Sequence, residues 1–156
     1  MLIVSACLAG VKCKYNGEDN FNPRCRELLA AGRVQLVCPE QLGGLPTPRV
    51  PAEIQGGSGE DVLDGQSRVL NREGQDMTEA FLRGAQETLR IARLVGAEGA
   101  VLKEGSPSCG STLIYDGTFQ GRKKAGQGVT AALLRREGLP VWSENDLSLL
   151  LEKKGG

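Results

Sequence analysis

Five cysteines are the residues of this chain best suited to metal or nucleophile chemistry, because its 156 residues include no histidine. Without an imidazole there is no Ser-His or Cys-His catalytic pair and no histidine ligand for zinc or non-haem iron. Metal binding therefore falls to thiolates, and proton transfer falls to carboxylates, hydroxyls and backbone amides. An odd set of cysteines does not suit a disulfide framework, so we expect a cytoplasmic protein with metal-binding or reactive thiols.

Three of the cysteines each follow an apolar run that predicts a buried strand: Cys7 after residues 2–4, Cys38 after residues 34–37, and Cys109 after residues 99–102. The carboxyl ends of parallel strands meet at one edge of an α/β sheet, where ligands bind. We therefore expect these three thiols to share one site. The alternative is that they are inert buried thiols.

Several groups could occupy a site of three thiolates. A tetrahedral Cys₄ zinc site usually uses close CxxC pairs, which the sequence lacks. A cubane iron–sulfur cluster accepts widely separated ligands and can leave one iron without a cysteine. Cys13, followed by Lys14, could be a fourth ligand or a thiol with a lowered pKa. Cys25 falls in a predicted helix and is expected to be structural.

Other chemical groups lie in the same predicted loops. Glu40 follows Cys38 and Pro39, so its carboxylate is the best general-base candidate, with a salt-bridging glutamate as the alternative. The loop 103–111 surrounds Cys109 with glycines and hydroxyls that could form a nest of N–H donors. The segment 121–128 predicts a mobile basic loop that closes over a ligand, or else a solvated surface loop.

Composition excludes several classes of protein. Nineteen basic and nineteen acidic residues give zero net charge, which disfavours a general nucleic-acid binder. The N-terminal apolar run is too short for a signal peptide or a membrane span, so no membrane association is expected. Only 4% of the residues are aromatic, so no base-stacking platform is predicted.

The predicted elements alternate between strands and helices. Helices are expected after Asn22, over residues 76–95, from Val129 to Glu137 and from Asp146 to Lys153, with a last strand at 140–142. The Gly- and Pro-rich stretch 43–59 predicts a long functional loop, and residues 62–71 predict a small hairpin or an irregular excursion. This alternation predicts one α/β domain over residues 1–156, a three-layer sandwich with a mainly parallel, Rossmann-like sheet.

The order of the motifs resembles that of a bacterial family, formerly a domain of unknown function, typified by thiouracil desulfurase. The resemblance covers almost the whole chain and is carried by residues 5–10, 14–17, 38–40, 103–110, 126–130 and 143–145. It implies a [4Fe-4S] cluster held by Cys7, Cys38 and Cys109, with the fourth iron open. It also implies a non-redox removal of sulfur from a 2-thiouracil-like base, whose sulfur would bind the open iron.

The same resemblance implies roles for other residues. Those matching Glu40 and Ser106 would assist water attack and proton transfer, and Ser106 could orient the water. The backbone amides of Ser108, Gly110 and Ser111, with Lys103 in the same loop, would hold the substrate. The expected partners are a small thiolated pyrimidine and a sulfur acceptor, for which Cys13 is a candidate.

Two other functions remain open from the sequence. A non-catalytic iron–sulfur or zinc sensor would need the three cysteines but not Glu40 or Ser106. A small-molecule-binding α/β domain would carry the cysteines as free thiols. Iron content and thiouracil turnover distinguish these alternatives.

Overall fold

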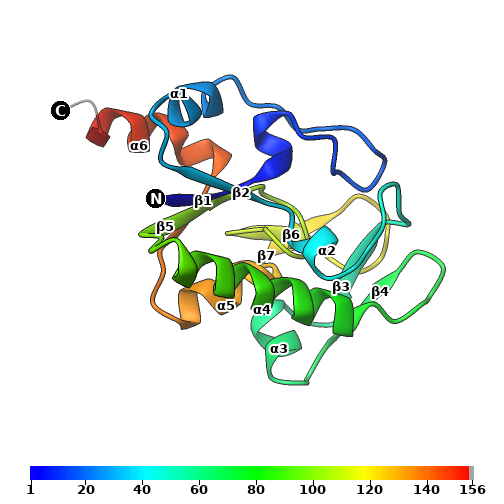
Figure 1. Cartoon of the computed structure of the whole chain (residues 1–156). Coiled ribbons are helices and arrows are strands. Elements are labelled where there is room, and N and C mark those ends of the chain that lie inside the picture. Colours follow the sequence, from blue (N-terminus) through cyan, green and yellow to red (C-terminus); the bar gives the residue numbers. More distant parts are fainter. Residues whose placement is uncertain (155–156) are drawn as a thin grey trace.

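A four-stranded parallel sheet forms the centre of the protein, described here from a computed structural model that covers residues 1–154. Its strands are β1 (Leu2–Ser5), β2 (Val34–Val37), β5 (Gly99–Leu102) and β8 (Val141–Ser143). They lie in the order β2-β1-β5-β8, so the first strand of the chain is central (Figure 1). The predicted α/β class with a mainly parallel sheet is confirmed.

Helices cover both faces of this sheet (Figure 1). The α-helices are α1 (Cys25–Ala30), α2 (Pro39–Leu42), α3 (Gly59–Leu63), α4 (Thr78–Leu94), α5 (Val129–Arg136) and α6 (Leu147–Lys154). Two 3₁₀ helices, η1 (Ala6–Ala9) and η2 (Glu144–Asp146), directly follow β1 and β8. In residues 1–154, no helix combines the length and apolar character that crossing a membrane requires.

Alternation along the buried strands divides the core into two layers. Ile3 of β1 packs in the cluster that α4 and α5 complete, whereas its neighbours Leu2 and Val4 pack in the cluster of α1 and α6. Successive strand residues point to opposite faces, so a strand covered on both sides needs a continuous apolar run. This is why the short apolar runs in the sequence predicted the central strands correctly.

Two hairpins extend from the sheet and correct the sequence-based predictions. The predicted loop 43–59 contains β3 (Ala52–Gln55), which pairs with β4 (Arg68–Asn71) across the intervening helix α3. Of the two alternatives for residues 62–71, the hairpin is wrong, because this stretch holds the end of α3, a turn and β4. In the basic segment, β7 (Lys123–Ala125) pairs with β6 (Leu113–Tyr115). Unlike the central strands, β3 (AEIQ) and β7 (KKA) have no apolar run that marks a strand in the sequence.

The predicted helix boundaries are mostly close to the observed ones. The Asn22 side chain accepts a hydrogen bond from the Arg24 amide (3.0 Å), although regular α-helix begins only at Cys25. After the C-terminal end of α4, Gly96 adopts a φ of +63°, which residues with a side chain rarely adopt. The end of this helix could be predicted from the sequence because a glycine at this position depends only on backbone conformation.

Helix α2 is held against α4 by two glycines. Gly43, after α2, and Gly84, within α4, are the points of contact: a Cβ on Gly84 would overlap the carbonyl oxygen of Pro39, and one on Gly43 would overlap that of Ala80. The backbones of the two helices therefore approach closely. Since α2 begins directly after Cys38, this contact fixes the position of the residues that follow β2.

We expect Gly84→Ala to destabilise the protein by about 1–3 kcal/mol, because the new methyl group overlaps a backbone carbonyl that cannot rotate away. Helix propensity alone would give the opposite sign, a gain of about 1 kcal/mol. Urea unfolding measures the change. Gln86→Ala on the exposed face of α4 is the control. Higher stability in Gly84→Ala would show that the helices are not in close contact.

Candidate functional site

A cavity of about 390 Å³ lies at the carboxyl edge of the sheet. It is lined by residues that follow β1, β2 and β5 and by parts of both hairpin regions. The lining includes Ser5, Cys7, Cys13, Lys14, Tyr15, Cys38, Glu40, Arg49, Glu53, Arg72, Lys103, Glu104, Ser106, Ser108, Cys109, Tyr115 and Phe119. This is the edge at which the sequence places the chemistry-bearing loops.

The three predicted thiols all line this cavity. Cys7 lies in η1 directly after β1, Cys38 follows β2, and Cys109 lies in the long loop after β5. Cys7 and Cys38 are half-buried, and Cys109 is buried. The parallel register aligns Ser5 of β1 with Val37 of β2, so the loops carrying Cys7 and Cys38 leave the sheet side by side.

Cys13 lies between two of these thiols and is itself buried. Its hydrogen bonds to Cys7 and Cys38 lower the pKa of Cys7, and they lower that of Cys38 to about 6. The same bonds, with burial, raise the pKa of Cys13 above its ordinary value. Cys13 is therefore protonated, and its single S–H can donate to one of the two neighbours at a time. The suggestion that its own pKa is lowered is wrong.

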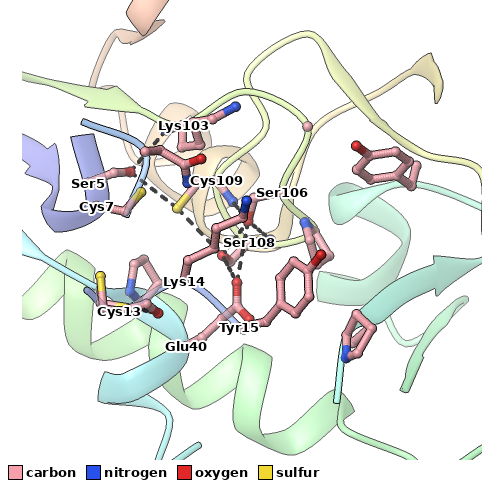
Figure 2. A pocket seen from close by; sticks show the side chains of 18 of the residues that line it. Ser5, Cys7, Cys13, Lys14, Tyr15, Glu40, Lys103, Ser106, Ser108 and Cys109 are labelled. Carbon is pink, nitrogen blue, oxygen red and sulfur yellow. Dashed lines mark hydrogen bonds between the residues drawn. The ribbon is translucent and has the colours of Figure 1, made fainter. Parts of the chain in front are cut away.

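Cys109 has a different environment. Burial raises its pKa to about 12, although the hydroxyls of Ser108 and Ser5 donate hydrogen bonds to its sulfur, each at 3.5 Å. Figure 2 shows both serines beside this sulfur. The fifth cysteine, Cys25, is buried in the core between α1 and α6 and does not line the cavity, in agreement with its predicted structural role.

Glu40 lies in the first turn of α2, which begins at Pro39. Proline suits this position because its missing N–H has no partner there in any helix. The two carboxylate oxygens of Glu40 have different partners. Oε2 accepts hydrogen bonds from Ser108 (3.0 Å) and Ser106 (3.4 Å), as Figure 2 shows, whereas Oε1 is paired with Arg49.

The hydroxyls of Ser106 and Ser108 are 2.9 Å apart, so the carboxylate and the two hydroxyls form one hydrogen-bonded group. Ser106 also accepts bonds from the backbone amides of Ser108 and Cys109, each at 3.1 Å. Such a group can hold a water molecule and move a proton between oxygens. The structure thus brings Glu40 and Ser106 together, as predicted, and adds the Ser108 hydroxyl.

Glu104 organises the loop that carries these serines. Its Oε1 accepts the amides of Ser111, Thr112 and Leu113 (2.8–2.9 Å), and its Oε2 accepts the hydroxyls of Ser111 and Thr112. One buried carboxylate therefore accepts the hydrogen bonds of all these donors in residues 111–113. Sequence reasoning missed this role because nothing local distinguishes Glu104 from a surface glutamate.

The structure differs from the prediction at Gly110 and Ser111, which do not line the cavity. The Gly110 amide donates to the carbonyl of Ser106 and the Ser111 amide to Glu104, so neither is available to a substrate. The expectation that these amides form an open nest is wrong, because Glu104 occupies it. Lys103 does line the cavity, but its ammonium group is paired with Glu144 (3.0 Å).

Loss of charge on Glu104 should unfold the protein in acid. Burial raises the pKa of this carboxyl, but the hydrogen bonds it accepts outweigh burial and lower it to about 2. A group with a lowered pKa contributes stability above its unfolded-state value near 4.5, and this contribution is lost as pH falls toward 2. We expect a loss on the order of 2–3 kcal/mol over that window.

Urea unfolding of the metal-free protein between pH 5 and pH 2 tests this prediction. Glu104→Gln should be less stable at pH 5 and should lose less on acidification than the wild type. Glu73→Gln, which changes an exposed glutamate, is the control for removing one negative charge. Equal pH dependence in the wild type and Glu104→Gln would contradict the assignment.

Aromatic side chains form part of the cavity wall, although the composition suggested no stacking surface. Tyr15, Tyr115 and Phe119 all line the cavity. A cation lies about 5.5–6.0 Å from each ring centre, namely Lys14, Lys123 and Arg72 respectively. Their sequence positions are too far apart to suggest a common surface.

The donor set of the cavity can be compared with what metals require. Within residues 1–154, no group of three cysteine or carboxylate side chains lies in the arrangement that holds a single metal ion. The cavity thiols instead come from separate loops around a space. Each iron of a cubane cluster takes one thiolate, so its ligands do not need to meet at one point.

The sequence and the fold were compared with known proteins. Residues 2–146 match the 2-thiouracil desulfurase family. The chain belongs to this family. It is 49% identical over 151 residues to the uncharacterized protein YbbK of Bacillus subtilis (strain 168), a match that covers 97% of this chain and all of YbbK. Among solved structures it resembles the [4Fe-4S]-dependent thiouracil desulfidase TudS, with a TM-score of 0.85, 45% identity and 97% coverage of both chains.

Membership of the 2-thiouracil desulfurase family confirms the resemblance seen in the motifs and makes this protein an enzyme. The matched residues contain all five cysteines, Glu40 and the serine-rich loop, so the cavity lies within the region that the family shares. The related desulfidase is described as [4Fe-4S]-dependent. A thiouracil substrate is consistent with this family.

Proposed function

We propose that this protein removes sulfur from a thiolated pyrimidine such as 2-thiouracil, without redox change, and releases the oxo base. The observation that carries the proposal is the meeting of three thiols from three strand ends with a carboxylate that bonds two hydroxyls in one cavity. Similarity to a desulfidase that depends on a [4Fe-4S] cluster supports it.

Cys7, Cys38 and Cys109 would hold a [4Fe-4S] cluster. The donor set fits, because all three side chains are thiols on one cavity wall and two of them have a lowered pKa, which favours the thiolate that iron binds. When bound, such a cluster would supply an iron without a cysteine ligand, to which a soft thiocarbonyl sulfur binds while the adjacent carbon becomes more electrophilic.

Glu40 and the serine hydroxyls beside Cys109 would activate water. Glu40 accepts a proton from a water molecule held by the Ser106 and Ser108 hydroxyls, and the oxygen of that water adds to the carbon of the thiocarbonyl. The carbon–sulfur bond then breaks, and Ser106 passes the proton on to the departing sulfur or a ring nitrogen. The balanced reaction consumes one thiobase and one water and yields the oxo base and hydrogen sulfide.

Other features of the proposal follow from the charge and the cavity. A small thiolated pyrimidine is favoured over nucleic acid because the chain has zero net charge. Of the predicted substrate-binding residues, Lys103 and Ser108 line the cavity. The Ser108 amide, predicted to hold the substrate, donates instead to the Ser106 hydroxyl. The reducing cytoplasm suits free thiols and an iron–sulfur cluster. Residues 1–156 would act as a single domain, and the sulfur would leave it as hydrogen sulfide.

Anaerobic reconstitution with iron and sulfide tests the function. We expect a brown protein with about four irons per chain, loss of the 2-thiouracil absorbance, and equal yields of uracil and sulfide. A colourless protein holding one zinc would overturn both cofactor and function. A brown protein that leaves 2-thiouracil unchanged would favour the sensor alternative.

A further inference from the structure

We propose that Arg49 is a positioning residue that holds the Glu40 carboxylate in the orientation needed for water activation. The inference rests on the proposed function, in which Glu40 is the base. It goes further by assigning a role to a residue in the Gly- and Pro-rich segment between α2 and β3, where the sequence indicates only a loop.

The Arg49 side chain is almost fully occupied by the protein itself. Its Nε donates to Glu40 Oε1 at 3.0 Å, and one terminal nitrogen donates to the Cys13 carbonyl at 2.9 Å. The other terminal nitrogen donates to the Thr47 hydroxyl and the Pro46 carbonyl. A guanidinium group has five N–H donors, so four of them are used in these bonds.

This arrangement separates positioning from substrate binding. Although Arg49 lines the cavity, its side chain is only 7% exposed, and its donors are directed at protein acceptors. A cation that binds an anionic substrate would keep donors free toward the cavity. Arg49 is therefore placed to act through Glu40 rather than on the substrate.

The contact determines which carboxylate oxygen faces the hydroxyls. Arg49 occupies Oε1 of Glu40, so Oε2 is left to Ser108 and Ser106. Without Arg49 the carboxylate could rotate about its last bond, because terminal torsions of glutamate are broad. A displacement of about 1 Å in a reacting group can cost on the order of 100-fold in rate.

Arg49 also ties together two walls of the cavity. Its backbone amide donates to the Tyr15 carbonyl at 2.7 Å, and its side chain binds the Cys13 carbonyl. The Cys38 sulfur lies 3.9 Å from that same carbonyl oxygen. One residue thus links the loop after β1 to the start of α2, where Glu40 lies.

A kinetic double-mutant cycle on the reconstituted enzyme tests the inference. Arg49→Met should lower kcat about 100-fold with KM within about twofold, and Arg49→Lys should recover about a tenth of the wild-type rate. In a Glu40→Gln background, Arg49→Met should change kcat by less than about twofold, because its effect passes through Glu40. If the loss of kcat in the double variant equalled the product of the losses in the two single variants, the positioning role would be overturned.

Arg136→Met is the matched control, because Arg136 pairs with Asp64 on the surface, and its kcat should stay near that of the wild type. A second cycle measures urea unfolding of the metal-free proteins. Each single variant should raise the unfolding constant by some factor. The factor for the double variant should be about tenfold smaller than the product of the two single factors. If the two single factors multiplied in full, the positioning role of Arg49 would be overturned, whatever the kinetic result. Failure of the wild type to desulfurise 2-thiouracil would instead count against the proposed function.

Discussion

Replacing Cys38 with serine should reduce the iron content of the reconstituted protein from about four per chain to below about one, with complete loss of thiouracil turnover. The reason is that a serine hydroxyl remains protonated near neutral pH, whereas the pKa of the Cys38 thiol is lowered to about 6 by its hydrogen bond from Cys13. Iron analysis and visible absorption measure the loss. Cys7→Ser and Cys109→Ser should behave in the same way.

Cys25→Ala is the matched control, because this cysteine is buried in the core away from the cavity. It should keep the iron and the colour, while its unfolding free energy falls by about 1 kcal/mol through the lost packing. Loss of colour in Cys25→Ala with retention in Cys38→Ser would show that the ligands are assigned wrongly.

Glu40→Gln should lower kcat by about 10²- to 10⁴-fold while iron content and KM change little. Glutamine keeps the length of the side chain and can still accept the Arg49 hydrogen bond, so the variant removes the basic carboxylate with little change of shape. Initial rates of uracil formation, with iron analysis of each preparation, check this result.

The control for Glu40→Gln is Glu137→Gln, which alters another carboxylate paired with an arginine, here Arg93 on the surface. Its kcat should equal that of the wild type. If Glu40→Gln retained more than a third of wild-type turnover, water activation would have to come from another group at the cavity, and the serine hydroxyls would be examined next.

Local sequence was enough to predict the residues that follow buried strands. The runs before Cys7 and Cys109 are apolar on both faces, and the run before Cys38 is apolar except for Gln35. These runs indicated parallel strands and placed the three thiols at one edge. Glu40 was found for the same reason, since it lies two residues beyond Cys38. These predictions depended on neighbours in the sequence and on one rule of sheet topology.

The partners of these residues could not be predicted, because tertiary contacts choose them. Arg49 lies in a Gly- and Pro-rich stretch whose pattern gives no direction for its side chain. Glu104 is followed by glycine and proline, and only the folded turn shows that its carboxylate binds three amides. The open nest predicted around Gly110 failed for this reason, since donors that are free in the sequence are already bonded in the fold.

The position of β1 between β2 and β5 has a consequence for how the site assembles during synthesis. The first strand to leave the ribosome cannot gain its second neighbour until residues 99–102 have been synthesised. Cys109 follows that strand, so its thiol joins those of Cys7 and Cys38 only late in translation. A cofactor that needs all three thiols would therefore have to be inserted after Cys109 has been synthesised, although Cys7 and Cys38 can become neighbours as soon as β1 and β2 pair.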